Sequence, residues 1–274
     1  MKPTRALAWS AIVVSIGAAE LRAGPSMADS LVQRVRDRYD GKDIFSEVAL
    51  TLVDENGARR ERSLLYFQKD FADDEKMLLY FTGPGDVKGV GLNSISYPEA
   101  SGKTDDQWIY LPAFKQVKRV PGNDKRGSFM GSEFSYYDME KIKAQDFSQK
   151  VLGEEKVGGE DCVKLERTST SSGTIRKSGY SRTIVWIQRE KGIVMKQLFY
   201  NEAGFDFKEM KVLSVQNIQN VWTVTEAEMF NKESGRKSRI LFRNVRYDCG
   251  VAAKVFQNEI IKEGVGDALI PKVH

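Results

Sequence analysis

The sequence has one histidine, His274, and two cysteines, Cys162 and Cys249, among its 274 residues. A single histidine in a C-terminal stretch of weak periodicity argues against histidine-based triads and dyads. One histidine and two cysteines are also too few ligands for a zinc site of the usual kind. We therefore expect no metal, and no pattern in the chain indicates a cofactor.

The chain also has little excess charge. Its formal net charge is +4, and its basic and acidic residues are well mixed. A nucleic-acid-binding protein usually shows a larger positive excess that is clustered on one face, so we expect no nucleic-acid partner. The composition, 41% apolar and 29% charged, is that of a soluble globular protein able to bury a core.

Long apolar runs are absent too. The longest, residues 6–19, is well short of the ~20 residues that a membrane-spanning helix needs. It follows a basic start with Lys2 and Arg5 and ends in small residues, which is the pattern of a secretory signal peptide. We expect residues 1–23 to be this signal peptide, with cleavage after Ala19 or Ala23. The mature protein is then expected in the periplasm.

An oxidising compartment permits a disulfide between the two cysteines. Cys162 and Cys249 each lie next to a predicted strand, and a bridge between them would close a long loop. We predict that they lie close enough to bridge. The alternative is two free buried thiols, and the sequence does not choose between the two states.

Secondary structure is predicted to be mostly β. Residues 26–39 predict one amphipathic helix, and the following chain alternates apolar and polar residues between turn signals, as expected for roughly ten or more antiparallel strands in one continuous meander. Residues 183–188 are apolar on both faces, so we expect a curved or helix-covered sheet. We predict one domain over residues 24–250 and a weakly ordered tail over 251–274. The predicted apolar face of the helix carries Leu31, Val32, Val35 and Tyr39.

Catalytic patterns are weak. The stretch SGKT, residues 101–104, lacks the glycine that a phosphate-binding loop needs at position 97, where Tyr97 stands. Carboxylate pairs such as Glu226 and Glu228 share a strand face and could be offered for glycoside hydrolysis. A solvated strand face explains them better, so we expect no enzyme. Asp105 and Asp106 are a weaker pair, because neighbouring positions on a strand point to opposite faces.

The most distinctive stretch is DQWIYLPAFKQVKRV, residues 106–120, followed by GNDKRGSFMGSEFSYYDM, residues 122–139. It closely resembles the outer-membrane lipoprotein-sorting proteins of the LolA-like group. That group carries a tryptophan–aromatic–proline strand, a basic strand and then a Ser-Phe-Met-Gly-Ser-acidic-Phe run. The match extends through 107–139, and one departure is Tyr137, where an acidic residue often stands.

The resemblance implies a mainly β fold with few helices. The expected architecture is a strongly curved antiparallel sheet, an incomplete barrel like LolA and LolB, with helices plugging the open side. The lumen of such proteins takes acyl chains or other apolar ligands. The implied function is a periplasmic carrier for lipoproteins or other lipids, with an RND-type inner-membrane exporter or an outer-membrane acceptor as a partner. We expect a monomer. The alternative is a lipid-sensing regulator on the same fold that signals ligand occupancy to a partner protein.

Two sets of residues are the candidate contacts. Aromatic and methionine side chains could line or cover the lumen, or could form ordinary core. Basic residues could bind a headgroup or an acidic partner, or could protect an edge strand from aggregation. The candidate ligand-binding residues are Trp108, Tyr110, Phe129, Met130, Phe134 and Tyr136. The candidate basic residues are Lys115, Lys118 and Arg119.

Overall fold

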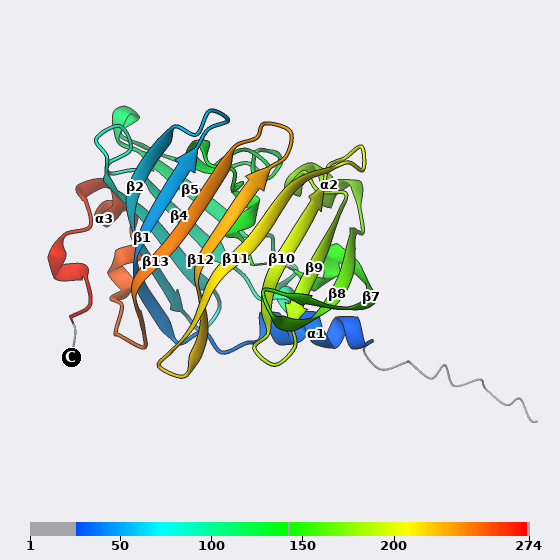
Figure 1. Ribbon diagram of the computed structural model, residues 1–274. Coiled ribbons are helices and arrows are strands. Elements are labelled where there is room, and N and C mark those ends of the chain that lie inside the picture. The colour runs from blue at the N-terminus through cyan, green and yellow to red at the C-terminus, as the bar shows by residue number, and fades with distance from the viewer. Residues whose placement is uncertain (1–25, 142, 273–274) are drawn as a thin grey trace, which may run out of the picture.

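The computed structural model describes residues 26–141 and 143–272 (Figure 1). The predicted signal peptide and His274 lie outside the described residues.

One antiparallel sheet of 13 strands forms the body of the protein, in the order β6-β5-β4-β3-β2-β1-β13-β12-β11-β10-β9-β8-β7. It is strongly curved and is not closed into a barrel (Figure 1). This confirms the predicted fold class. The strands are β1 (Asp43–Val53), β2 (Arg59–Asp70), β3 (Glu75–Gly83), β4 (Gly91–Ser96), β5 (Asp106–Leu111), β6 (Gln116–Arg119), β7 (Phe147–Val157), β8 (Glu160–Ser169), β9 (Arg182–Gln188), β10 (Ile193–Tyr200), β11 (Asp206–Ile218), β12 (Val221–Asn231) and β13 (Lys237–Tyr247). The α-helices among the described residues are α1 (Met27–Arg36), α2 (Ser172–Ser178) and α3 (Asn258–Glu263).

The strands form two meanders rather than the single one expected. The first meander runs from β1 to β6 and the second from β7 to β13, and they join where β1 pairs with β13, for example Leu50 with Ile240. The strands β6 and β7 therefore lie at opposite edges of the sheet. Residues 120–146 connect these edges, and their Phe129 and Tyr137 are buried in one core with Leu50 of β1 and Phe199 of β10. The connection thus crosses the concave side, where we expected helices.

The helix α1 covers another part of the concave side (Figure 1). Ser26 caps it, because the Ser26 hydroxyl accepts a hydrogen bond from the Asp29 amide at 3.1 Å. Leu31 and Val32 are buried against β8 and β9, as the apolar spacing predicts. Tyr39 was wrongly placed on this face. The helix ends at Arg36, and Tyr39 is exposed with its hydroxyl 2.7 Å from Asp248.

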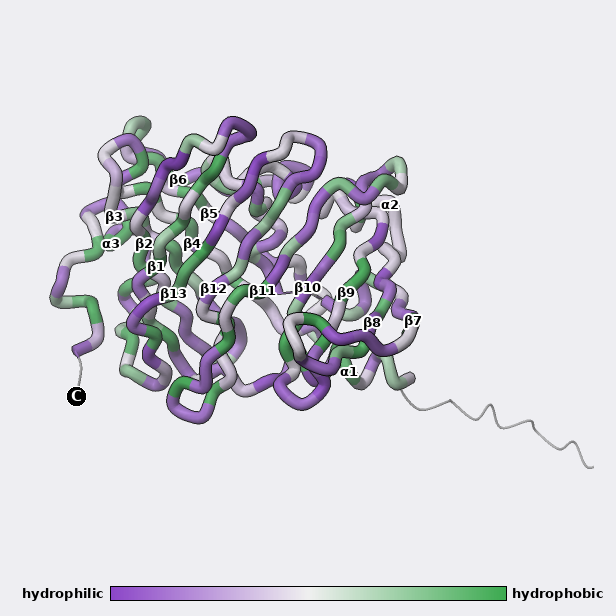
Figure 2. The backbone as a smooth tube through the Cα atoms, viewed as in Figure 1, coloured by the Kyte–Doolittle hydropathy of each residue, from purple (hydrophilic) through white to green (hydrophobic). Residues whose placement is uncertain are grey.

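The strand β9 is covered on both faces, which explains its continuous apolar run. Val185 and Ile187 pack under α1. Trp186 points to the convex face, where its indole N–H donates to Glu155 at 3.0 Å. The ammonium groups of Lys164 and Lys196 lie 4.8 and 4.7 Å from its ring, so the lysine side chains shield the indole from water. Figure 2 shows hydrophobic and hydrophilic stretches interleaved along the neighbouring strands.

The chain after β13 covers the convex face of β1–β5. Val255 and Ile261 are buried there with Phe67 of β2 and Leu78 of β3. The Asn93 side-chain amide of β4 donates to the Phe256 carbonyl at 2.9 Å. A weakly ordered tail therefore does not describe residues 251–272, which form short helical turns packed on the sheet.

Candidate functional site

The Gly-rich stretch 127–139 forms a compact turn inside the concave core. The Phe129 amide donates to the Phe134 carbonyl at 2.8 Å, and both rings are buried. The turn between them needs two residues of positive φ, Met130 at 50° and Gly131 at 75°. Glycine takes this conformation without steric cost, whereas Met130 adopts it under strain. The turn is held by hydrogen bonds within it and by one to β13, where the Ser238 hydroxyl accepts from the Glu133 amide at 2.9 Å.

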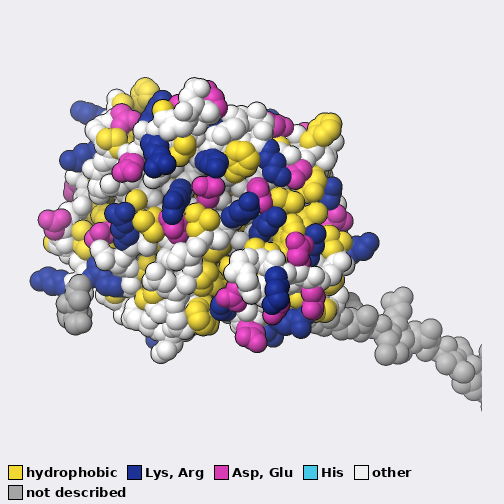
Figure 3. Space-filling model, viewed as in Figure 1, with side chains coloured by type: hydrophobic (Ala, Val, Ile, Leu, Met, Phe, Trp, Pro, Cys, Tyr) yellow, Lys and Arg dark blue, Asp and Glu magenta, His cyan; other side chains and the backbone are white. Residues whose placement is uncertain are grey.

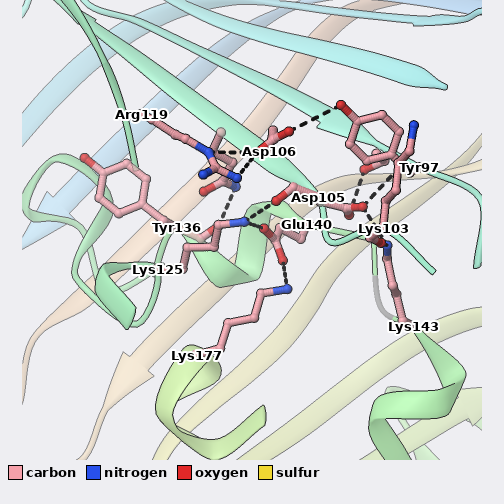
Figure 4. A network of polar contacts seen from close by, with 12 residues as sticks. Tyr97, Lys103, Asp105, Asp106, Arg119, Lys125, Tyr136, Glu140, Lys143 and Lys177 are labelled. Carbon is pink, nitrogen blue, oxygen red and sulfur yellow. Dashed lines mark hydrogen bonds and ion pairs between the residues drawn. The ribbon is translucent and has the colours of Figure 1, made fainter. Parts of the chain in front are cut away.

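A buried ion cluster fixes this connection to the sheet and to α2 (Figure 4). The Lys125 ammonium, 3% exposed, donates to the Asp105 carbonyl at 2.6 Å and pairs with Glu140. Glu140 also pairs with Lys177 of α2 at 2.8 Å. The Asp105 carboxylate pairs with Lys143 at 2.9 Å. Since each buried charge has an opposite partner, the desolvation cost of the cluster is offset.

A second set of bonds fixes the connection to the segment between α2 and β9 and to β11. The Asp138 carboxylate accepts hydrogen bonds from the Tyr180 hydroxyl at 2.9 Å and the Ser135 amide at 2.8 Å, and it pairs with Lys208 at 3.2 Å. Burial and the Asp138 charge raise the pKa of Tyr180 well above its usual value. Tyr180 therefore remains a neutral hydrogen-bond donor under physiological conditions.

A cavity of about 340 Å³ lies between this connection, the region that ends α1 and the concave face of β8–β12. Its volume lies within the ~300–1,000 Å³ of small-molecule sites. A second cavity of about 260 Å³ shares Val35, Arg38 and Arg167 with the first, so the two adjoin. The apolar wall of the larger cavity includes Phe134, Tyr137, Phe147, Tyr180, Phe199 and Met229.

One charged side chain stands out in this wall. Arg167 of β8 is 4% exposed and borders both cavities. Its guanidinium lies 4.6 Å from the centre of the Phe147 ring, and its buried Nε has no hydrogen-bond partner among the described residues. Burial lowers the pKa of Arg167 to about 10, so the side chain stays charged at neutral pH.

The candidate ligand-binding residues divide between the two faces of the sheet. Phe134 lines the larger cavity, and Phe129, Met130 and Tyr136 pack in the concave core beside it. Trp108 and Tyr110 were assigned to the wrong face. Strand alternation puts the intervening Ile109 in the concave core and Tyr110 among the residues of the convex core.

Most of the cavity residues that sequence reasoning missed come from β8 to β12, and Tyr180 lies just before β9. Arg167 carried a usable signal, because strand alternation puts it on one face with Val163 and Leu165, which are apolar and buried under α1. A charge in an otherwise apolar strand face marks a site candidate. Tyr180 and Met229 carried no comparable local signal, since their approach to Phe134 depends on the curvature of the sheet.

The basic candidates lie at the exposed edge of the sheet. The strand β6 is the terminal strand and carries Lys118 and Arg119. The Arg119 guanidinium donates to Asp106 at 2.8 Å, and the Lys118 ammonium lies 5.4 Å from the Phe114 ring centre. Lys115 precedes the strand with φ of 50°. These positions fit an edge-protecting strand, and contact with a headgroup or partner stays a prediction.

The predicted proximity of Cys162 and Cys249 is wrong, and of the two states left open the structure has the free thiols. Cys162 lies in β8 and Cys249 follows β13, and four strands separate these two in the sheet. Each cysteine lies near the end of a strand, and the local sequence around the two looks similar. Their separation depends on the order of the strands in the sheet, which the residues around the cysteines do not show.

The carboxylate pairs are engaged in ion pairs. Arg239 of β13 pairs with Glu226 of β12, and Lys237 lies 3.9 Å from Glu228. On the face toward the viewer in Figure 3, basic and acidic side chains are interspersed in the same way. Within residues 26–141 and 143–272, no group of three or more His, Cys, Asp or Glu residues could hold a metal ion.

Comparison with known proteins places the chain in a family. A family model described as "Uncharacterized protein" matches residues 73–263. The structure of a DUF1329 family protein from Desulfovibrio piger is similar, with 29% identity, a TM-score of 0.78 and coverage of 85% of this chain and 96% of that one. The structure of a provisionally assigned outer membrane lipoprotein-sorting domain from Vibrio parahaemolyticus is also similar. It has 27% identity, a TM-score of 0.77 and coverage of 85% of this chain and 97% of that one. The chain belongs to this LolA-like family.

More distant similarity supports the same fold. A LolA superfamily protein from Nitrosomonas europaea is 17% identical, with a TM-score of 0.63 and coverage of 85% of this chain and 98% of that one. No curated protein sequence matches significantly. None of the helices in the described part of this LolA-like protein is long and apolar enough to cross a membrane.

Proposed function

We propose that this LolA-like protein is a periplasmic carrier that binds acyl chains of lipoproteins or other lipids in its concave cavity. It transfers them between membrane partners, such as an RND-type exporter and an outer-membrane acceptor. The observation that carries the proposal is the preformed cavity of about 340 Å³ with an aromatic and methionine wall. A similar protein described as a lipoprotein-sorting domain gives further support.

The physical requirement of such a carrier matches this cavity. An acyl chain crossing water must be shielded, at about 0.8 kcal/mol for each CH₂ group removed from water. Phe199 and Met229 offer apolar contact, and methionine adapts to chains of different shape. The ion cluster of Lys125 and Glu140 fixes the connection that bounds the cavity, so the binding surface is formed before the ligand arrives and less entropy is lost on binding.

The export step of the proposal rests on residues 1–23. Protein purified from the periplasm should begin at Glu20 or Gly24. Amino-terminal sequencing that finds intact Met1 in the membrane fraction would contradict a soluble periplasmic carrier.

Filling the cavity tests the binding step. Ala227 of β12 is buried and lines the cavity, so Ala227→Phe places a ring in the ligand's space. Delipidated variant protein should bind a fluorescent fatty acid at least about ten-fold more weakly than the wild type. The matched control is Ala113→Phe, because Ala113 is exposed, and it should bind normally. If delipidated wild-type protein binds neither the fatty acid nor an acylated peptide, the carrier function is wrong.

A further inference from the structure

A row of polar side chains interrupts the apolar wall. Gln149, Arg167 and Thr183 are direct cross-strand neighbours on β7, β8 and β9, so they share the concave face. The apolar Phe199 of β10 is the next neighbour in the row. Arg167 and Thr183 are 4% and 2% exposed. The Arg167 Nε, the Thr183 Oγ1 and the Gln149 Oε1 are all buried and have no hydrogen-bond partner within residues 26–141 and 143–272. Such groups are rarely left unpaired in folded proteins.

The carboxylates around the two cavities do not neutralise Arg167. Three line the cavities, namely Asp40, Asp138 and Glu140. Each already has a lysine partner, since Asp138 pairs with Lys208 at 3.2 Å, Asp40 lies 3.6 Å from Lys141, and Glu140 holds Lys125 and Lys177. Arg167 makes no ion pair with any described residue, and its guanidinium instead lies over the Phe147 ring.

A buried guanidinium of this kind is suited to an anion. Its planar fork of N–H donors matches the oxygens of a carboxylate or phosphate, and the low dielectric of a buried site strengthens the interaction. The Thr183 hydroxyl, directly across on β9, adds a second donor at the same level of the wall. Apolar surface continues from there through Phe199, Ala227 and Met229 of the larger cavity.

We infer that the ligand is an anionic amphiphile whose carboxylate or phosphate binds Arg167 and Thr183 inside the cavity, with its acyl chain along β10–β12. This inference rests on the proposed carrier function and narrows it to acidic lipids. The polar group of the ligand is then held at the junction of the two cavities rather than in solvent.

The test compares two ligands of one chain length, dodecanoate and its neutral methyl ester, by calorimetry on delipidated protein. The wild type should bind dodecanoate at least about ten-fold more tightly than the ester. Arg167→Met should remove this preference while leaving ester binding within about two-fold. Arg182→Met is the matched control, because Arg182 on the neighbouring strand pairs with Glu166, and it should keep the preference.

A milder variant guards against misfolding. Thr183→Val keeps the shape of the side chain. It should weaken the binding of dodecanoate several-fold without changing the binding of the ester. If Arg167→Met and Thr183→Val both keep the wild-type preference, the inference is wrong although the carrier function stands. If no acyl ligand binds the wild type, the carrier function fails as well. If inorganic phosphate binds through Arg167 and dodecanoate does not, the anion at this site does not belong to a lipid, and the inference is wrong.

Discussion

Gly91 of β4 and Ile261 of α3 approach so closely that a β carbon on Gly91 would lie 2.6 Å from the Ile261 Cγ2 atom. Ile261 is 2% exposed and packs on the convex face of the sheet. The missing side chain of Gly91 therefore makes room for the C-terminal segment. The same face carries Tyr110, the cross-strand neighbour of Gly91.

This contact predicts a specific stability defect. Gly91→Ala should lower the free energy of unfolding by about 1–3 kcal/mol, because overpacking displaces either the strand or α3. In the Ile261→Ala background the same substitution should cost much less, since the clashing atom is gone. Urea denaturation of the four proteins measures this coupling. Gly122→Ala is the control, because a β carbon there meets no atom within 4 Å; an equal cost in both backgrounds would contradict the close contact.

The sequence predicted the fold more fully than the site, for a physical reason. Alternation along strands such as Ile193–Tyr200 is a local property, so strand content and the two-sided burial of β9 could be read directly. The cavity depends on which strands face each other across the curved sheet. Phe134 and Met229 are 95 positions apart in the chain and meet only because residues 120–146 must connect opposite edges.

The errors have the same origin. Trp108 and Tyr110 have the right composition for a lipid site but lie on the face that α3 covers, and no local pattern shows which face becomes concave. Residues 251–272 have weak periodicity because Val255 and Ile261 are held by strands far away in the sequence rather than by a regular element. The family resemblance led to Phe134, which lines the cavity. It did not show which side chains of β5 face the concave side.

The free cysteines predict unreactive thiols rather than a bridge. Burial and the nearby Asp43 carboxylate raise the pKa of Cys249 to about 11, and burial also raises the pKa of Cys162. The nucleophilic thiolate is therefore scarce at pH 7. Native protein should react slowly with a thiol reagent, whereas protein denatured without reductant should show two thiols. Fewer than two thiols in the denatured, unreduced sample would contradict the assigned separation.

The buried ion cluster predicts a large cost for removing one charge. Lys125→Met leaves the Asp105 carbonyl without its donor and Glu140 with Lys177 alone. Since Lys125 and Glu140 side chains are each 3% exposed, we expect a loss of about 3 kcal/mol in unfolding free energy. Lys118→Met, at an exposed position, should change it by less than about 0.5 kcal/mol. Similar denaturation midpoints for the two variants would mean that the cluster contributes little.

The carboxyl group of Glu75 predicts how stability depends on pH. Glu75 lies at the start of β3, and its burial raises its pKa to about 7. The Asp40 and Asp70 charges also raise this pKa, whereas Lys141 lowers it. Its ordinary value is 4.5, so between these two pH values the folded protein holds the proton more tightly than the unfolded chain. The contribution of Glu75 to stability therefore falls as pH rises from 4.5 to 7, by up to about 3 kcal/mol.

Replacing this carboxyl group isolates its share of the pH dependence. Glu75→Gln cannot titrate, so the variant should gain stability relative to the wild type as pH rises from 4.5 to 7.5. Urea midpoints of the variant and the wild type at the two pH values measure this gain. Because both proteins carry the same other titrating groups, the effects of those groups cancel in the comparison. Glu154→Gln serves as the control because Glu154 is exposed and paired with Arg189 on the surface, and it should follow the wild type. A wild-type and a Glu75→Gln protein with parallel pH profiles would show that Glu75 ionises as an ordinary carboxyl, with Lys141 outweighing the effect of burial.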